Sequence, residues 1–335
     1  MDDIRYTTTY EIDGVIASGG MGTVYLAKQT GANGFKKTVA IKTIRKRYMA
    51  DKENVSMLIG EAKLVANLVH ENILQVLQLG MRNGAFYIVM EYAHGRDLNY
   101  FIHHHKTENT FTDIQIAAFI VSRVARALHC AHTAKSLKGR PLGLVHRDVN
   151  PGNIIITQRG VVKLTDFGVA KALTMKTPPE NEVLMGKLPY LSPEMAHFEA
   201  TTPASDVYSL GLVLFELLTN RRVFEVESLE LLQELMDSYA LAPPSVVQAD
   251  VPPELDRIVL KATAPDPNLR YKTAQEMGND LESFMYGNGL GPTNEALSNY
   301  IDTQFGPEGF IPRVKKEKED KIKAKIEEVK KKKKS

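Results

Sequence analysis

The segment 146–168, HRDVNPGNIIITQRGVVKLTDFG, places an acid, an amide and a second acid on two turns joined by a short hairpin. The amide Asn153 follows the acid Asp148 by five residues, and the acid Asp166 follows thirteen residues later. Phosphoryl transfer needs such a set, because one carboxylate positions the attacking hydroxyl while an amide oxygen and a second carboxylate hold Mg²⁺ on nucleotide phosphates. A loop rich in Asp and Asn only because these residues favour turns is the alternative, and it does not explain the spacing.

The same segment resembles the catalytic core of the eukaryotic-type protein kinases, in which His-Arg-Asp and Asp-Phe-Gly triplets occur together at this spacing. The resemblance implies that Asp148 orients the substrate hydroxyl and receives its proton, and that Asn153 and Asp166 hold magnesium. It also implies structural or regulatory roles for three flanking residues, Arg147, Phe167 and Gly168.

A glycine-rich turn near the start of the chain, ASGGMG at 17–22, resembles the phosphate-binding loop of the same family. Glycines let backbone N–H groups approach phosphate oxygens where a Cβ would obstruct them. Ala17 stands where the family has its first glycine, but the two glycines nearest the phosphates remain. Because a glycine-rich turn alone is a weak signal, a plain hairpin is the alternative here.

The sequence Val39-Ala-Ile-Lys42 resembles the third-strand lysine motif, in which Lys42 contacts the α- and β-phosphates and pairs with an acid on the next helix. Glu61 is the candidate for that acid by position, because Glu53 is too near the helix start and Glu71 lies past its end. An exposed strand lysine and a surface glutamate are the alternative for either residue taken alone.

The remaining nucleotide contacts implied by the resemblance come from the glycine-rich turn, its strands and a hinge whose backbone would bind adenine. The implied cofactors are ATP and Mg²⁺, with Mn²⁺ as an alternative metal. The full set of cofactor-binding residues is Ile16, Ala17, Ser18, Gly19, Gly20, Met21, Gly22, Val24, Ala40, Lys42, Met90, Glu91, Ala93, Asn153, Ile155 and Asp166.

Three features of the later sequence favour a protein substrate, since small-molecule kinases of related fold usually lack them. Ser192-Pro193-Glu194 stands where the family has Ala-Pro-Glu, and Arg270 matches the arginine that pairs with Glu194. Asp206 begins a helix that anchors the catalytic loop in the family. The tyrosine-kinase form of that loop, with arginine two or four residues after Asp148, is absent, which favours serine and threonine as acceptors.

Two departures from the family pattern belong together. Ser/Thr members usually carry lysine two residues after the catalytic aspartate, where this chain has Asn150, and threonine at the position of Lys187. In the family fold these positions face each other beside the transferred phosphate, so Lys187 is predicted to replace the missing ammonium. A neutral change at 150 with a solvated lysine at 187 is the alternative. The motifs around both positions, and an inserted segment at 135–141, look like those of bacterial relatives.

Thr174 and Thr177 are the hydroxyl residues between Gly168 and Gly186. Because Arg147 precedes the catalytic aspartate, a phosphate on this loop could order it. The sequence therefore predicts autophosphorylation at one or both threonines, with Thr174 favoured, and self-association for transfer between two copies.

The elements that must position these residues form two groups. Strands are expected at 10–17, 23–28, 38–44, 73–80 and 86–91, with one helix at 54–68, and later helices at 204–219, 226–238, 253–263 and 273–286. This order indicates the α+β, bilobal protein-kinase fold, with a small antiparallel β-rich lobe and a larger, mainly α-helical lobe. The expected domains are 1–93, 94–288 and a C-terminal extension at 289–335 with a flexible Lys-rich tail.

Residues 312–335 hold twelve Lys/Arg and five Asp/Glu, so this tail carries +7 and the rest of the chain −5. A solvated tail is one interpretation, and weak attraction to anionic lipid, nucleic acid or an acidic partner is the other. The single cysteine excludes a disulfide framework, and the sequence indicates neither a signal peptide nor a transmembrane segment. A cytoplasmic location, peripheral to the inner face of the membrane through the tail, is expected.

His103-His104-His105 invites a metal site, but adjacent helical residues point about 100° apart and cannot converge on one ion. A solvated helix end is expected instead.

The sequence thus predicts an ATP- and Mg²⁺-dependent protein kinase that transfers the γ-phosphate to Ser/Thr hydroxyls of proteins, of the bacterial eukaryotic-like kind. A pseudokinase scaffold that binds nucleotide and partners without efficient transfer is the first alternative. A protein whose main activity lies in the tail is the second.

Overall fold

The computed structural model describes residues 8–19, 22–45, 59–60, 62, 64–82, 84–136, 138–167, 187–238, 240–287, 289–312 and 314. The chain divides into two compact units, each with its own core. The first comprises residues 1–49, 76–92 and 312–335, and the second comprises residues 50–75 and 93–311.

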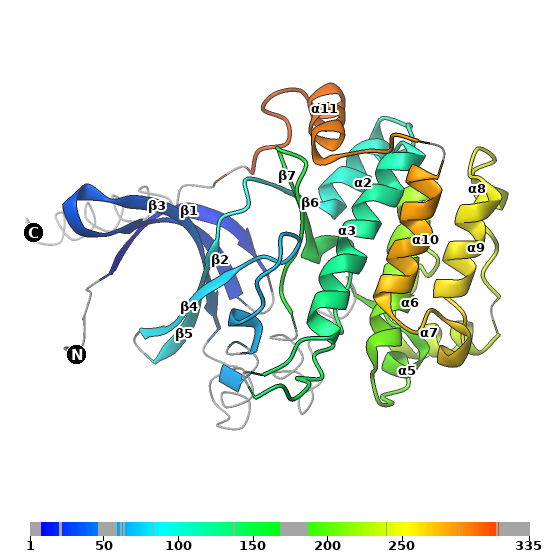
Figure 1. The fold of residues 1–335 in the computed structure, drawn as a ribbon, viewed down its shortest axis with the longest axis horizontal. Coiled ribbons are helices and arrows are strands. Elements are labelled where there is room, and N and C mark those ends of the chain that lie inside the picture. The colour runs from blue at the N-terminus through cyan, green and yellow to red at the C-terminus, as the bar shows by residue number, and fades with distance from the viewer. Residues whose placement is uncertain are drawn as a thin grey trace, which may run out of the picture. The chain divides into compact units, whose positions relative to one another are not determined.

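The first unit is built on one antiparallel sheet of five strands in the order β1-β2-β3-β5-β4. Figure 1 shows these strands in blue and cyan: β1 (Thr9–Ser18), β2 (Gly22–Thr30), β3 (Lys36–Ile44), β4 (Val76–Arg82) and β5 (Ala85–Glu91). Residues that alternate along the strands form one face of the core, as period-two patterns predict: Ala27, Val39, Ile41 and Val89, covered by Tyr10 and Tyr87.

The predicted strands are confirmed with one change of boundary. The strand expected at 73–80 begins only at Val76, and Ile73 instead forms an isolated parallel bridge with Leu164 in the second unit. The apolar side chain of Ile73 suggested a strand residue. It is instead buried in the core of the second unit, which explains why the position is apolar.

The second unit has a helical core with a small sheet of three antiparallel strands. That sheet contains β6 (Gly95–Asp97), β7 (Ile154–Thr157) and β8 (Val162–Leu164). In the core, α3 (Ile114–His132) packs against α6 (Pro203–Thr219) and α10 (Ala274–Tyr286). Helix α6 confirms the helix predicted at 204–219 and is buried along nearly its whole length. Within the helix expected at 54–68, residues 59–60, 62 and 64–66 are helical, and the helix ends before residue 67.

Of the remaining helices of the second unit, α7 (Leu229–Ser238) and α9 (Pro253–Ala262) match the segments predicted at 226–238 and 253–263, and the others were not predicted. The longer of these others are α2 (Leu98–Thr107) and α11 (Asn294–Phe305). The short ones are α5 (Pro193–Ala196) and α8 (Pro244–Val247), together with single 3₁₀ turns at Ala32–Gly34 in the first unit and Pro151–Asn153, Leu188–Tyr190 and Pro267–Leu269 in the second.

Among the described residues, one helix is long and apolar enough to cross a bilayer, and that helix is α3. Two thirds of its apolar window (67%) is buried inside the second unit. Its apolar surface is therefore already covered by the neighbouring helices, as in a core helix.

Helix α11 lies in the expected C-terminal extension and packs on α2 (Figure 1). The rings of Phe305 and Phe310 contact the Phe101 ring of α2, one tilted and the other edge-on, with centroids 5.5 and 6.3 Å away. The solvated helix end predicted for the three histidines is wrong for His105, which is fully buried. Its ring lies 2.9 Å from the Thr110 hydroxyl and 3.2 Å from the hydroxyl of Tyr300 on α11.

Candidate active site

The backbone of the catalytic loop is fixed by one buried carboxylate. Asp206, in the first turn of α6, is fully buried and accepts hydrogen bonds from the backbone N–H groups of His146 and Arg147, both at 2.7 Å. Its carboxylate also lies 2.8 Å from Nε2 of His132 on α3. A buried carboxylate must be fully partnered, and here its partners hold the turn in which Arg147 has a φ of 63°.

The two catalytic turns are tied together by His146. Its Nε2 lies 3.0 Å from the carbonyl of Thr165, and its Nδ1 accepts the backbone N–H of Asp148 at 3.2 Å. The ring of Phe167, 4% exposed, meets the His146 ring edge-on with centroids 4.6 Å apart. The Phe of the second triplet therefore packs against the His of the first, and Asp166 between them takes a φ of 62°.

The carboxylate of Asp148 is surrounded by donors. Its Oδ1 accepts the side-chain amide of Asn150 at 2.9 Å, and its Oδ2 accepts the side-chain amide of Asn153 at 2.9 Å. The ammonium of Lys187 forms an ion pair with the same Oδ2. These contacts fix the direction of the carboxylate, and 14% of the Asp148 side chain remains exposed.

The residues predicted to hold magnesium have the chemistry for it. Asn153 uses its NH₂ group on Asp148, with a second bond to the carbonyl at 2.8 Å, so its amide oxygen can act as a ligand. The described residues contain no cluster of three or more His, Cys, Asp or Glu side chains that could hold a metal alone. Magnesium needs only one or two such protein oxygens, because substrate phosphates and water complete its octahedron. Asn153 and Asp166 fit that requirement.

Within the first unit, strand register gathers predicted nucleotide-contacting residues on one face of the sheet. Val24 of β2 lies opposite both Ala17 and Lys42, and Ala40 lies opposite Met90 of β5. Directly paired residues and residues two apart point to the same side of a sheet. These five side chains therefore lie on one face of the sheet, where four are apolar and the fifth, Lys42, carries an ammonium group.

The turn between β1 and β2 needs its last glycine. A Cβ on Gly22 would stand 1.8 Å from the carbonyl of Thr43, so a larger residue would push β2 away from β3. Gly19 donates its N–H to the Gly22 carbonyl at 2.9 Å, and Ser18 and Thr23 face each other across the turn at 3.3 Å. The two described ends of the predicted phosphate loop are thus joined by contacts between Gly19 and Gly22 and between Ser18 and Thr23.

The other predicted residues fall as follows. In the first unit, Ile16 lies on β1 and Glu91 is the last residue of β5. In the second unit, Ile155 lies on β7 and Ala93 is the first residue after the segment 76–92. Several predicted residues lie outside the described residues, and their assignments stay predictions: Gly20, Met21, Glu61, Gly168, Thr174 and Thr177.

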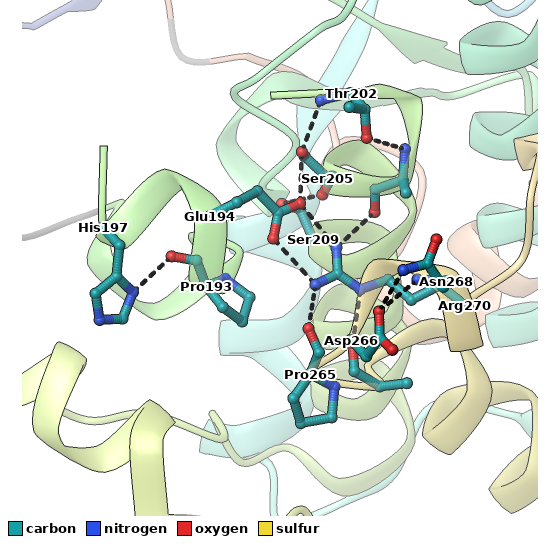
Figure 2. A network of polar contacts seen from close by, with 12 residues as sticks. Pro193, Glu194, His197, Thr202, Ser205, Ser209, Pro265, Asp266, Asn268 and Arg270 are labelled. Carbon is teal, nitrogen blue, oxygen red and sulfur yellow. Dashed lines mark hydrogen bonds and ion pairs between the residues drawn. The ribbon is translucent and has the colours of Figure 1, made fainter. Parts of the chain in front are cut away.

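The ion pair expected between Glu194 and Arg270 is present (Figure 2). The guanidinium donates to both carboxylate oxygens, at 2.8 and 3.0 Å, and the Ser205 hydroxyl donates to Oε1 of Glu194 at 2.6 Å. Burial alone would raise the pKa of the Glu194 carboxyl, but the hydrogen bonds from Arg270 and Ser205 outweigh it and lower the pKa. The carboxylate therefore stays charged and links α5 to α6 and the turn before α10.

A second buried network was missed by sequence reasoning. The hydroxyl of Tyr190 donates to Oε2 of Glu216 on α6 at 2.5 Å, and Arg222 donates to Oε1 at 3.2 Å. Burial and the Glu216 carboxylate raise the pKa of the Tyr190 hydroxyl, so it remains protonated and a donor. Glu216 was visible as a charge inside the most apolar stretch of the chain, and a buried charge requires partners.

Arg147 also has a partner that its motif did not indicate. Its Nε donates to the Thr201 hydroxyl at 3.0 Å, in the segment between α5 and α6.

The protein kinase domain family matches residues 10–280 of the chain. The chain belongs to the protein kinase family. The chain is also similar to several curated bacterial enzymes that are named serine/threonine-protein kinases.

The kinase is 38% identical over 284 residues to the serine/threonine-protein kinase PrkC of Bacillus subtilis, covering 83% of this chain and 41% of PrkC. It is 36% identical over 299 residues to the tyrosine-protein kinase MasK of Myxococcus xanthus, covering 89% of this chain and 46% of MasK. The chain therefore spans less than half the length of these relatives.

Among solved structures, the kinase is similar to the PknI kinase domain of Mycobacterium tuberculosis, with 26% identity and a TM-score of 0.61. The match covers 82% of this chain and 94% of the PknI chain, and it confirms the protein-kinase fold predicted from the sequence.

Proposed function

We propose that this kinase transfers the γ-phosphate of ATP, with Mg²⁺, to serine or threonine hydroxyls of protein substrates. The observation that carries the proposal is the Asp148 carboxylate, whose two oxygens are held by the amides of Asn150 and Asn153 on a backbone fixed by Asp206. A carboxylate oriented in this way can accept a proton from an attacking hydroxyl in a defined direction.

The reaction assigned to this site is an in-line displacement. The acceptor oxygen forms a bond to the γ-phosphorus, and the bond from that phosphorus to the β,γ-bridging oxygen breaks, so ADP leaves with the electron pair. The hydroxyl proton passes to the Asp148 carboxylate. Bound magnesium would neutralise charge on the phosphates, held by the Asn153 amide oxygen and the Asp166 carboxylate. Lys42 is assigned to the α- and β-phosphates.

The protein contributes mainly by holding these groups in place before reaction. Asp206 positions the backbone of His146 and Arg147, and His146 positions both Asp148 and the segment before Asp166. Positioning and electrostatic stabilisation supply most of the rate enhancement in phosphoryl transfer, because the loose transition state asks little covalent chemistry of the enzyme.

The preference for serine and threonine rests on the catalytic loop. Its positions two and four residues after Asp148 are Asn150 and Gly152, where tyrosine kinases have an arginine. A Cβ on Gly152 would stand 3.0 Å from both the Asn150 oxygen and the Asn99 amide, so a larger residue there would require these two side chains to shift. Because the relative MasK is named a tyrosine kinase, the acceptor is a question for experiment.

Autophosphorylation of the full chain with Mg-ATP, followed by phosphoamino-acid analysis and site mapping, tests the proposal. We expect phosphoserine or phosphothreonine, and phosphotyrosine alone would overturn the acceptor assignment. The variant Asp166→Asn should weaken nucleotide binding in the presence of Mg²⁺ and leave the metal-free binding little changed. Nucleotide binding without transfer to any substrate would support the pseudokinase alternative.

A further inference from the structure

Lys187 lies beside the catalytic carboxylate although it is 39 residues away in the sequence. Its ammonium forms an ion pair with Oδ2 of Asp148, and 31% of its side chain remains exposed. The ammonium is therefore anchored on Asp148 by a side chain that is not fully buried. Such a side chain can also contact a group that binds beside Asp148.

The backbone that carries Lys187 is fixed by buried neighbours. Leu188, Pro189 and Tyr190 form a 3₁₀ turn whose side chains are all buried, and the Tyr190 N–H donates to the Lys187 carbonyl at 3.0 Å. The Tyr190 hydroxyl is bound in turn to Glu216 in the middle of α6. The backbone of Lys187 is thus fixed by the core of the second unit. Its side chain is restricted by the ion pair with Asp148, whereas the side chain of an ordinary surface lysine is free to rotate.

The catalytic loop carries a neutral amide, Asn150, two residues after Asp148. Asn150, 8% exposed, donates its amide to the backbone oxygen and to Oδ1 of Asp148, both at 2.9 Å, and its own Oδ1 accepts the Gly152 N–H at 2.9 Å. Every polar atom of this side chain is used to shape the loop. It orients Asp148, but as a neutral group it cannot stabilise charge that develops on a phosphate.

We infer that Lys187 is a catalytic cation: it contacts the transferring phosphoryl group as well as Asp148 and stabilises the negative charge that develops there. The inference rests on the proposed function, since it assigns a residue to that reaction. In the displacement described above, the hydroxyl proton still goes to Asp148 and the electron pair still leaves with ADP. The ammonium of Lys187 keeps its protons and acts only through its charge and hydrogen bonds.

Two residues of this chain thus take the place of the single lysine that family members usually carry at position 150. Asn150 shapes the loop, and Lys187 brings the charge from a different segment. The charge is in place only while residues 187–190 are docked on α6 through Tyr190 and Glu216. Chemistry in this kinase therefore depends on docking of that turn more directly than it would if the cation were carried by the catalytic loop.

The test compares the full chain with Lys187→Met, which keeps the length of the stem and removes the charge. Lys187→Thr alone and combined with Asn150→Lys asks whether a charge placed on the catalytic loop restores what the turn has lost. Lys138→Met is the matched control, because Lys138 is an exposed lysine of the same unit, in the segment inserted before the catalytic loop. Melting temperature reports whether each variant folds.

Two readouts are needed, one of turnover and one of binding. We expect Lys187→Met to lower kcat ten-fold or more, equivalent to about 1.4 kcal/mol, with KM for ATP within two-fold of the parent. In equilibrium binding, it should weaken the affinity for Mg-ADP with aluminium fluoride, an analogue of the transferring phosphoryl group, and leave the affinity for Mg-ADP unchanged. Asn150→Lys should recover part of both losses in the Lys187→Thr background, and Lys138→Met should change neither quantity.

The outcomes separate this inference from the proposed function. If the parent transfers phosphate and Lys187→Met matches it in kcat and in fluoride-complex affinity, Lys187 is not a catalytic cation, although the kinase assignment stands. If Asn150→Lys recovers nothing while Lys187→Met melts well below the parent, the role of Lys187 is structural and the inference fails. If the parent itself transfers no phosphate, the proposed function fails and this inference fails with it.

Discussion

The guanidinium of Arg270 donates two hydrogen bonds, of 2.8 and 3.0 Å, to the carboxylate of Glu194, and the pair is almost wholly buried. The remaining donors of Arg270 are used on the backbone oxygens of Ala264, Ala204 and Pro265. A residue 76 positions away in the sequence thus fixes the start of α5 and, with it, the turn that carries Lys187 and Tyr190.

Removing Arg270 should be costly, because it leaves a buried carboxylate without its counter-charge. We expect Arg270→Met to lower the free energy of unfolding by about 3–5 kcal/mol. Arg257→Met is the control, since Arg257 forms its ion pair with Asp280 at the surface, where such pairs contribute about 0–1 kcal/mol. Urea unfolding measures both, and equal losses in the two variants would contradict the assignment.

The same pair gives an acid-sensitive contribution to stability. Because the folded-state pKa of Glu194 is lowered, its contribution is complete above the unfolded value of about 4.3 and is lost as the pH falls through the folded value. Unfolding free energies measured between pH 6 and pH 3 should therefore fall less steeply in Glu194→Gln than in the parent. Parallel curves would show that Glu194 is not responsible.

His105 should make the free energy of unfolding depend on pH in a second, higher range. Burial, with a smaller effect of His104, lowers the pKa of His105 to about 4. The folded state therefore holds the neutral ring, while the unfolded chain takes up a proton below about pH 6.5. Stability should be complete above pH 6.5 and fall as the pH drops toward 4, by up to about 3 kcal/mol.

Unfolding free energies at pH 7 and pH 5 measure this effect. His105→Gln should reduce the difference between the two pH values, although it also lowers stability at both. His103→Gln is the control, because His103 is exposed on the same helix and should leave the difference as in the parent. A pH dependence that survives in His105→Gln would have another source.

How much the sequence could predict depended on how local each feature is. Asp148, Asn153 and Asp166 lie within nineteen residues and form a motif, so the resemblance to the kinase family could assign a role to each. The burial of His105 was not, because it depends on Tyr300, 195 residues later, which docks from α11. Helical periodicity argued against a shared metal for the three histidines but could not show that one of them faces another helix.

Glu216 shows the same limit in the core. A charge within an apolar helix predicts that partners exist, but only the fold identifies Tyr190 and Arg222, because they come from segments that the helix itself does not specify. Lys187 was conspicuous in the sequence as a departure from the family pattern. Its ion pair with Asp148 depends on the same docked turn and could not be read from the sequence alone.

Phosphorylation of the loop before Lys187 is the predicted switch. Autophosphorylation is expected at Thr174 or Thr177, and the double alanine variant should lose most of its activity if a phosphate there is needed to order the loop. Arg147 would bind that phosphate and exchange its present bond to Thr201. Phosphosite mapping by mass spectrometry, together with the kcat of the double variant, measures this. Full activity without both threonines would show that loop phosphorylation is not the switch.

The Lys-rich tail is proposed to hold a cytoplasmic kinase weakly at anionic membrane surfaces. Its net charge of +7 should give binding to vesicles that contain phosphatidylserine, weakening as salt rises, because each basic residue contributes about 1 kcal/mol near such a surface. A chain ending at residue 312 should lose this binding and keep its activity on a soluble peptide. Equal binding by both chains would favour an inert tail, and binding to nucleic acid alone would point to that partner instead.

Asp148 is proposed to perform chemistry and not merely to shape the loop. A comparison of phosphate transfer from Mg-ATP by the full chain and by Asp148→Asn tests this role, with nucleotide affinity and melting temperature measured on the same samples. We expect Asp148→Asn to bind Mg-ATP and to melt like the parent, while its kcat falls by about two to four orders of magnitude, the range of general-base catalysis. A kcat close to that of the parent would show that Asp148 is not the catalytic base.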